Sequence, residues 1–303
     1  MVPKEEGTAI KQPLTVGAAL EWAIETLKGA GVPEPETDAQ WLLSEVIALP
    51  RSLLFLERYR CLSTAQMKTF VGFIRQRQAR KPLAYLLKRS FFCGLELFVD
   101  ERVMIPRQET EILVEEVVKF LAGKAQPKIA DIGTGSGAIA CAIAHLIPDA
   151  VVWATDVSTA ALTVAQENVQ RLGYTDRIHL LSCDLAEGLS QALQGERLDA
   201  IVANLPYIAD DEWTLLPPEV KDHEPALALK GGPDGLAVVR RLLSQPTQQY
   251  LKPDGFLALE IGFSQVSPVK KLLTEAKWAL EKIQKDWSGH ERVVIARPSD
   301  LEC

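Results

Sequence analysis

The tetrapeptide Asn204-Leu205-Pro206-Tyr207 follows the apolar run 198–203 and could hold a planar NH2 group. The Asn204 side-chain oxygen and the Leu205 backbone carbonyl can accept both N–H bonds of an amide or aromatic amine, and the Tyr207 ring can stack on its plane. Pro206 fixes its own φ and favours an extended Leu205. Because the nitrogen lone pair of such a group is delocalised, its methylation would depend on positioning and a reactive donor, without an ionisable base. The tetrapeptide alone could also be an Asx-Pro turn.

A glycine loop, Gly133-Thr134-Gly135-Ser136-Gly137, lies roughly seventy residues upstream, between an expected strand and an expected helix. Glycines there permit positive φ and let the backbone approach a nucleotide-like ligand. Asp156, at the end of the next expected strand, can accept hydrogen bonds from both ribose hydroxyls. The loop also fits the dinucleotide pattern, so these features suit both NAD and S-adenosylmethionine.

Three further features favour S-adenosylmethionine. Asp131 precedes the first glycine by two residues and can act near a cationic amino-acid or sulfonium group. Asp184 follows the third expected strand, where it can accept from an adenine amino group, with Leu185 beside the ring. The C-terminal segments 278–286 and 292–297 form an expected antiparallel pair, which is typical of methyltransferase sheets. Asp131 and Asp184 could otherwise cap helices or turns.

Composition indicates a cytoplasmic enzyme of ordinary globular character. The 303 residues are 47% hydrophobic and 24% charged, without an apolar run long enough to span a membrane. The N-terminal segment 1–6 has neither a signal-peptide core nor a transit composition. The four histidines lack metal-ligand spacing, and we expect no metal. The cysteines never occur as CxxC and read as reduced thiols; they are Cys61, Cys93, Cys141, Cys183 and Cys303.

Charge is unevenly distributed along the chain. The net charge of −7 argues weakly against a protein that wraps nucleic acid. Residues 51–90, however, carry ten basic residues against the single acid Glu57. This stretch is either a solvated helix face or a docking patch for an acidic partner or RNA.

Three segments are expected along the chain. Residues 1–88 form a helical domain of four or five helices, because apolar residues between 14 and 87 recur at three- and four-residue spacing, and Ser63 could cap one of them. Residues 89–106 form a connector, with alternation over 91–105 that predicts a β-hairpin. Residues 107–303 form the catalytic domain.

In the last segment, strands and helices alternate, which predicts a mostly parallel, Rossmann-like α/β sheet. Helices are expected at 109–121, 138–146 and 159–172. Strands are expected at 128–132, 151–155, 178–181, 198–203 and 255–261, followed by the C-terminal hairpin with its turn at 287–290.

These motifs together resemble those of the N5-glutamine methyltransferases that modify class I peptide chain release factors. The resemblance covers nearly all of residues 15–297. Besides the glycine loop and the tetrapeptide, it rests on the blocks Lys81–Tyr85, Phe92–Leu95, Ile105–Glu111, Ala154–Asp156, Glu224–Leu229, Gly231–Leu236, Leu259–Gly262 and Gly289–Val294.

The resemblance implies a seven-stranded class I methyltransferase domain that uses S-adenosylmethionine. The implied substrate is the glutamine of the release-factor Gly-Gly-Gln loop, with the helical domain helping to recognise the release factor in support of translation termination. We expect a monomer that needs neither nucleic acid nor a membrane. The expected transfer residues are Asn204, Leu205, Pro206 and Tyr207. The expected cofactor residues are Asp131, Gly133, Thr134, Gly135, Ser136, Gly137, Asp156, Asp184, Leu185 and Asn204.

The chain departs from the family at Leu205, where the family usually has a proline. The backbone carbonyl survives this change, while the turn loses stiffness and gains an N–H. The resulting motif is also similar to that of rRNA adenine dimethyltransferases. Three alternatives therefore stay open: adenine-N6 methylation of DNA or RNA, a non-catalytic adaptor that binds a translation factor, and an NAD-dependent dehydrogenase.

Overall fold

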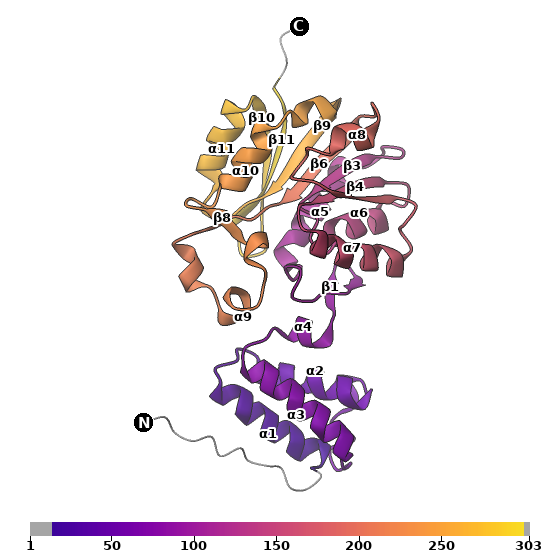
Figure 1. Cartoon of the computed structure of the whole chain (residues 1–303), viewed down its shortest axis with the longest axis vertical. Coiled ribbons are helices and arrows are strands. Elements are labelled where there is room, and N and C mark those ends of the chain that lie inside the picture. The colour runs from indigo at the N-terminus through magenta and orange to yellow at the C-terminus, as the bar shows by residue number, and fades with distance from the viewer. Residues whose placement is uncertain (1–13, 300–303) are drawn as a thin grey trace. The chain divides into compact units, whose positions relative to one another are not determined.

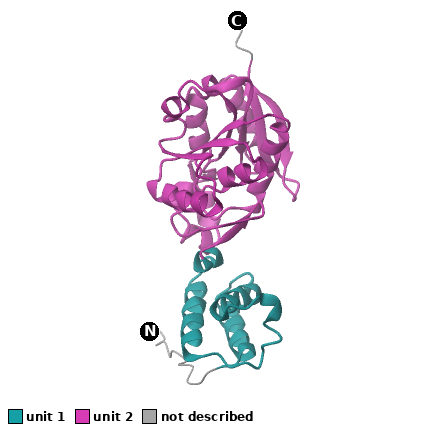
Figure 2. Ribbon diagram, turned by 90° about the vertical axis from the view of Figure 1, so that its right-hand side faces the viewer, with its two compact units in different colours: residues 1–87 teal, residues 88–303 magenta. Residues whose placement is uncertain are grey.

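The computed structural model describes residues 14–299 of the chain (Figure 1). It divides into two compact units between Leu87 and Lys88 (Figure 2). The N-terminal segment 1–6 and Cys303, on which the sequence carried expectations, lie outside the described residues. None of the described helices is long and apolar enough to cross a bilayer.

The first unit is a helical bundle with its own core, as the sequence predicted. Ser63 caps the third helix through a capping box: its hydroxyl accepts from the Gln66 backbone N–H at 3.2 Å, and its own N–H donates to the Gln66 side chain at 3.0 Å. In the core, the rings of Trp22 and Phe70 meet edge to face with centroids 6.2 Å apart. The helices are α1 (Val16–Gly29), α2 (Pro35–Ile47), the 3-10 turn η1 (Arg51–Leu53), α3 (Thr64–Gln78) and α4 (Leu83–Leu87).

Part of the basic stretch 51–90 serves this bundle internally. The Arg77 side chain is buried, and its Nε lies 2.7 Å from Oδ2 of Asp38 on α2. Arg51 donates to the Gln40 side chain at 3.0 Å. Arg77 and Arg51 therefore help to hold helices together, and the docking interpretation of the stretch rests on its other basic residues.

The second unit is built on a seven-stranded sheet with the order β10-β11-β9-β6-β3-β4-β5 (Figure 1). Strands β9, β6, β3, β4 and β5 run parallel, and β11 pairs antiparallel with both β9 and β10. This confirms the Rossmann-like methyltransferase sheet with a C-terminal antiparallel hairpin. The strands are β3 (Lys128–Ile132), β4 (Val151–Asp156), β5 (Ile178–Ser182), β6 (Leu198–Asn204), β9 (Leu251–Glu260), β10 (Trp278–Lys285) and β11 (Glu291–Pro298).

Helices cover both faces of the sheet because the central strands are apolar on both sides. Alternate residues of β6 belong to different cores: Ala200 and Val202 pack with α5 and α6, whereas Ile201 and Ala203 pack with α8, α10 and α11. The helices are α5 (Gln108–Phe120), α6 (Ala138–Leu146), α7 (Thr159–Leu172), α8 (Leu189–Leu193), α10 (Ala237–Ser244) and α11 (Val266–Glu275).

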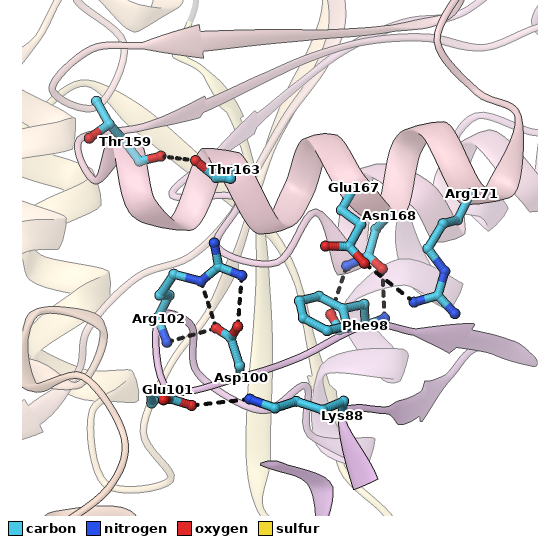
Figure 3. A network of polar contacts seen from close by, with 10 residues as sticks. All are labelled: Lys88, Phe98, Asp100, Glu101, Arg102, Thr159, Thr163, Glu167, Asn168 and Arg171. Carbon is cyan, nitrogen blue, oxygen red and sulfur yellow. Dashed lines mark hydrogen bonds and ion pairs between the residues drawn. The ribbon is translucent and has the colours of Figure 1, made fainter. Parts of the chain in front are cut away.

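The connector hairpin is shorter than the alternation over 91–105 predicted. It consists of β1 (Ser90–Phe92) and β2 (Leu95–Leu97), joined at Cys93 and Gly94, which both have positive φ. Beyond β2 a side chain takes the place of a partner strand. Asn168 of α7 accepts from the Phe98 backbone N–H at 2.6 Å and donates to the Phe98 carbonyl at 2.9 Å (Figure 3). The same Asn168 amide donates to the Ser136 carbonyl at 2.9 Å, which fastens the connector to the glycine loop.

A long insertion between β6 and β9 was not predicted from the sequence. It contains β7 (Ile208–Ala209) and β8 (Lys230–Gly232), which pair in parallel, together with the short helices η2 (Glu212–Leu215), α9 (Pro218–Lys221) and η3 (Ala226–Ala228). A further 3-10 turn, η4 (Thr247–Tyr250), leads into β9.

Candidate functional site

A cavity opens at the carboxyl ends of β3, β4, β5 and β6, where ligands bind in open parallel sheets. It is open to solvent, and the empty space in and above it is about 1110 Å³. Ten expected site residues line it: Gly133, Thr134, Gly135, Ser136, Asp156, Asp184, Leu185, Asn204, Leu205 and Pro206. The fold thus brings the glycine loop and the tetrapeptide into one cavity. Asp131, Gly137 and Tyr207 lie outside its lining.

The glycine loop leaves β3 and enters α6 through left-handed backbone conformations. Gly133 has a φ of 74°, and a Cβ there would lie 3.1 Å from Cδ2 of Leu205. Gly137, with a φ of 79°, is the residue at the start of α6. The close approach of Leu205 to Gly133 shows that the two motifs pack directly against each other.

Asp156 is held at the end of β4 by backbone N–H groups. Its Oδ2 accepts from Gly135 at 2.8 Å and its Oδ1 from Ser158 at 2.8 Å. Burial raises the pKa of this carboxyl, although the backbone N–H groups act to lower it. An ionised carboxylate has about four acceptor sites, so Asp156 can still accept from two ribose hydroxyls.

Asp131 lies beneath the loop and does not reach the cavity. It is fully buried, and its Oδ2 accepts from the Thr134 hydroxyl at 2.6 Å. Within residues 14–299, its Oδ1 has no hydrogen-bond partner. Burial raises the pKa of Asp131 to about 7. The carboxyl therefore supports the loop through Thr134. Any effect on a bound cation would be electrostatic and would not involve direct contact.

Asp184 and Leu185 line the cavity on the side of β5. The Asp184 carboxylate pairs with the Arg241 guanidinium, and Arg241 of α10 also lines the cavity. Leu185 has a φ of 52°, and its carbonyl accepts from the Thr155 hydroxyl at 2.9 Å. Sequence analysis missed Arg241, because no local pattern links it to a carboxylate 57 residues away.

Asn204 lies at the end of β6 with one end of its amide already engaged. Its Nδ2 donates to the Thr110 hydroxyl of α5 at 3.0 Å. Among the described residues, none donates to Asn204 Oδ1 or to the Leu205 carbonyl. Two acceptors therefore stay open beside the glycine loop. Thr110 was missed in the sequence, although it lies in the block Ile105–Glu111 that was singled out.

Behind Asn204 lies a buried carboxyl that sequence analysis did not single out as a site residue, Glu260 at the end of β9. The Tyr207 hydroxyl donates to its Oε1 at 3.4 Å. Burial raises the pKa of Glu260 to about 7, against neighbouring hydroxyls and the Arg292 charge, which lower it. The pKa of Tyr207 is also raised, by burial first and by Glu260 second. Tyr207 does not line the cavity, so stacking of its ring on a substrate stays a prediction.

An ion pair between distant blocks lies next to the cavity wall. Glu224 in the insertion pairs with the Arg107 guanidinium and accepts from the Ile105 backbone N–H at 3.2 Å. Burial raises the pKa of Glu224, while Arg107 acts to lower it. The prolines next to this pair, Pro106 and Pro225, both line the cavity. Among residues 14–299, no group of three His, Cys, Asp or Glu side chains could hold a metal ion.

Two family models match parts of the chain. The model of the PrmC N-terminal domain matches residues 18–87. The model of the methyltransferase small domain matches residues 107–216. Among solved structures, the hMettl16 catalytic domain in complex with a 3′UTR hairpin has a TM-score of 0.56 at 19% identity, covering 73% of this chain and 79% of that chain, and is similar in fold alone.

Relatives match this chain over nearly the whole of its length and of their own. The release factor glutamine methyltransferase of Moorella thermoacetica is 42% identical over 93% of this chain and 98% of its own length. That of Caulobacter vibrioides is 37% identical over 95% and 98%. With both domains and the full length matched, the chain belongs to the release factor glutamine methyltransferase family.

Proposed function

We propose that this enzyme transfers a methyl group from S-adenosylmethionine to the side-chain amide nitrogen of glutamine in the Gly-Gly-Gln loop of class I peptide chain release factors. The observation that carries the proposal is the pair of open acceptors, Asn204 Oδ1 and the Leu205 carbonyl, which belong to residues that line one cavity with the glycine loop. The names of the relatives support the same substrate.

The residues of the loop and strand ends fit the cofactor. Asp156 would accept from the ribose hydroxyls, Leu185 would pack against adenine, and Asp184 would accept from the adenine amino group beside Arg241. The Asp131 carboxyl lies under the loop and, when ionised, would suit a cationic ligand above it. When bound, S-adenosylmethionine supplies the activated methyl group.

The protein's part in the transfer is orientation. Asn204 Oδ1 and the Leu205 carbonyl would each accept one N–H of the substrate amide, which fixes its plane. The nitrogen lone pair lies perpendicular to that plane, so fixing the plane aims the lone pair. The nitrogen held in this way would receive the methyl group that S-adenosylmethionine supplies, and it would release one N–H proton. Neutral hydrogen bonds contribute only about 1 kcal/mol each, so their value here is geometric.

Adenine-N6 is also a planar NH2 group and would satisfy the same two acceptors. Charge favours the protein substrate: residues 91–303 carry a net −11, since residues 1–90 contribute +4 to the total of −7. A nucleic-acid substrate would need a basic path to the cavity. Family membership also argues against the dehydrogenase and adaptor interpretations.

We also propose that the helical unit, residues 1–88, helps to recognise the release factor in the cytoplasm. The segment after η1 exposes the large apolar side chains of Phe55, Leu56 and Tyr59, which are 72%, 73% and 80% exposed. Arg58 lies over the ring of Tyr59 at 5.1 Å. Exposed aromatic groups beside arginine are typical of protein interfaces.

The decisive experiment is mass spectrometry of a release factor after incubation with enzyme and S-adenosylmethionine. We expect a single added methyl group on the glutamine of the Gly-Gly-Gln peptide. Asn204→Ala should keep its affinity for S-adenosylmethionine by calorimetry and lose tens-fold or more in kcat. Methylation of DNA or RNA oligonucleotides instead of the release factor, or full turnover by Asn204→Ala, would overturn the proposal.

A further inference from the structure

A row of polar groups lies behind the acceptor pair and ends at a buried carboxyl, Glu260. Asn204 Nδ2 donates to the Thr110 hydroxyl at 3.0 Å. The Thr110 hydroxyl also faces Glu260 and acts to lower the pKa of that carboxyl, whose buried Oε2 has no direct hydrogen-bond partner among residues 14–299. The Tyr207 hydroxyl donates to the same carboxylate at 3.4 Å. These residues come from α5, β6, the turn after β6 and β9, so only the assembled sheet brings them together.

The direction of these polar contacts matters because the two ends of a carboxamide have nearly the same shape. Rotating the Asn204 amide by half a turn would place its NH2 group where the oxygen now lies. An NH2 group there would face the NH2 of the substrate and could accept nothing from it. Methylation therefore requires Asn204 to be held in one of two sterically similar orientations.

Glu260 decides which orientation is held. An ionised carboxylate is an acceptor only, and Glu260 is 1% exposed. The Thr110 hydroxyl faces this carboxyl, and Glu260 Oε2 can accept its proton because it has no other partner among the described residues. With its proton directed toward Glu260, Thr110 presents a lone pair to Asn204. A lone pair can be met only by the NH2 end of the amide, so Oδ1 turns away from Thr110.

We propose that Thr110 and Glu260 are positioning residues that lock the Asn204 carboxamide with its oxygen toward the substrate amide. The inference rests on the proposed function, because it assigns that oxygen the acceptor role. It goes further by assigning selectivity between two orientations to residues that never touch the reacting atoms. Thr110 accepts the hydrogen bond from Asn204 Nδ2, and Glu260 determines which way the Thr110 hydroxyl points.

The charged and titratable groups that face Glu260 come from each neighbouring element. Arg292 of β11 favours the carboxylate form, Glu109 of α5 disfavours it, and the Tyr207 hydroxyl donates to it. A protonated Glu260 could itself donate to Thr110, which would free the Thr110 proton for Asn204 Oδ1 and permit the wrong orientation. The lock therefore holds only while Glu260 is ionised.

The test compares Thr110→Val, which removes the acceptor at nearly constant volume, with Thr110→Ser, which keeps it. At saturating S-adenosylmethionine, we expect Thr110→Val to lower kcat on the release factor by ~tenfold or more. Its KM and its affinity for S-adenosylmethionine should stay within ~threefold of wild type. Thr110→Ser should recover most of the kcat. Thr247→Val is the matched control, since Thr247 is buried like Thr110 (1% against 4% exposed) and lies on η4, outside the cavity lining.

Glu260→Gln provides a second, independent measurement. Wild-type kcat should fall as the pH drops through about 7, whereas Glu260→Gln should have a low kcat without that transition. Equal losses in Thr110→Val and Thr110→Ser, or an unchanged transition in Glu260→Gln, would overturn the lock. If the wild-type enzyme left the release factor unmethylated, the proposed function would fail first, so the two failures are distinguishable.

Discussion

Glu260→Gln should stabilise the protein at alkaline pH even though it impairs catalysis. Burial raises the pKa of Glu260 from its ordinary 4.5 to about 7. Each pKa unit corresponds to 1.36 kcal/mol, so ionising Glu260 in the folded protein costs about 3 kcal/mol. Between those two pKa values the folded state binds the proton more tightly than the unfolded state does. The contribution of Glu260 to the free energy of unfolding is therefore fully present below about pH 4.5 and lost as the pH rises through 7.

The assay is urea denaturation of wild type and Glu260→Gln at about pH 5 and about pH 8.5. The stability difference, variant minus wild type, should grow by roughly 3 kcal/mol between the two pH values. Asp131, whose pKa is also about 7, is present in both proteins, so its contribution cancels in the difference. A difference that does not change with pH would refute the reasoning.

Glu116 offers a matched control with the opposite sign. It is also 1% exposed, but Lys282 and Lys119 lie 2.5 and 3.0 Å from its carboxylate oxygens. Burial alone would raise the pKa of Glu116, and these two hydrogen-bonded cations outweigh burial and lower it. Glu116→Gln should therefore destabilise the protein at neutral pH, and its penalty should shrink as the pH falls below the ordinary carboxyl range.

Three further predictions concern the cofactor, the helical unit and the departure from the family. Asp156→Asn should raise the Kd for S-adenosylmethionine, measured by calorimetry, by about ten- to a hundredfold, because hydrogen bonds to a charged group contribute about 1.5–3 kcal/mol. An unchanged Kd would show that Asp156 does not bind the cofactor. Arg77→Leu should lower the free energy of unfolding of the helical unit by ~3–5 kcal/mol, since it removes the guanidinium that pairs with the buried Asp38 carboxylate. A loss below ~1 kcal/mol would contradict that role. Leu205→Pro should keep kcat within a few-fold, because the backbone carbonyl is retained. Thermal unfolding should report a loss of ~1–3 kcal/mol in the free energy of unfolding, because the Leu205 contact with Gly133 disappears. A large fall in kcat would show that the leucine side chain itself is needed.

The elements of the sheet domain were predictable from sequence because their signals are local. Helices 138–146 and 159–172 have the predicted limits, since each is bounded by a glycine or a capping serine and has helical periodicity. The strands of the seven-stranded sheet were located to within a few residues for the same reason, with one exception. Strand β9 begins at Leu251, not at 255. Leu251 pairs with Leu198, and the pairing then passes through an irregularity that contains Pro253 and Asp254, which disfavour strands.

The connector shows where local pattern failed. Alternation over 91–105 predicted one long hairpin, but pairing stops at Leu97. The backbone of Phe98 is satisfied by Asn168, a residue 70 positions away. The alternation of residues within the connector does not depend on so distant a side chain. The length of the hairpin could therefore not be predicted from this alternation.

The sequence by itself determined the order of the strands along the chain, the glycine loop and the tetrapeptide, because each depends on backbone propensity and short-range spacing. Only the tertiary structure decided which of their side chains reach the cavity. It buried Asp131 beneath the loop, kept Tyr207 out of the lining, and placed Thr110 and Glu260 behind Asn204. Burial and hydrogen-bond direction depend on contacts between residues far apart in the sequence, such as Asn204 and Thr110, which are 94 positions apart. The packing of the whole sheet brings such residues together.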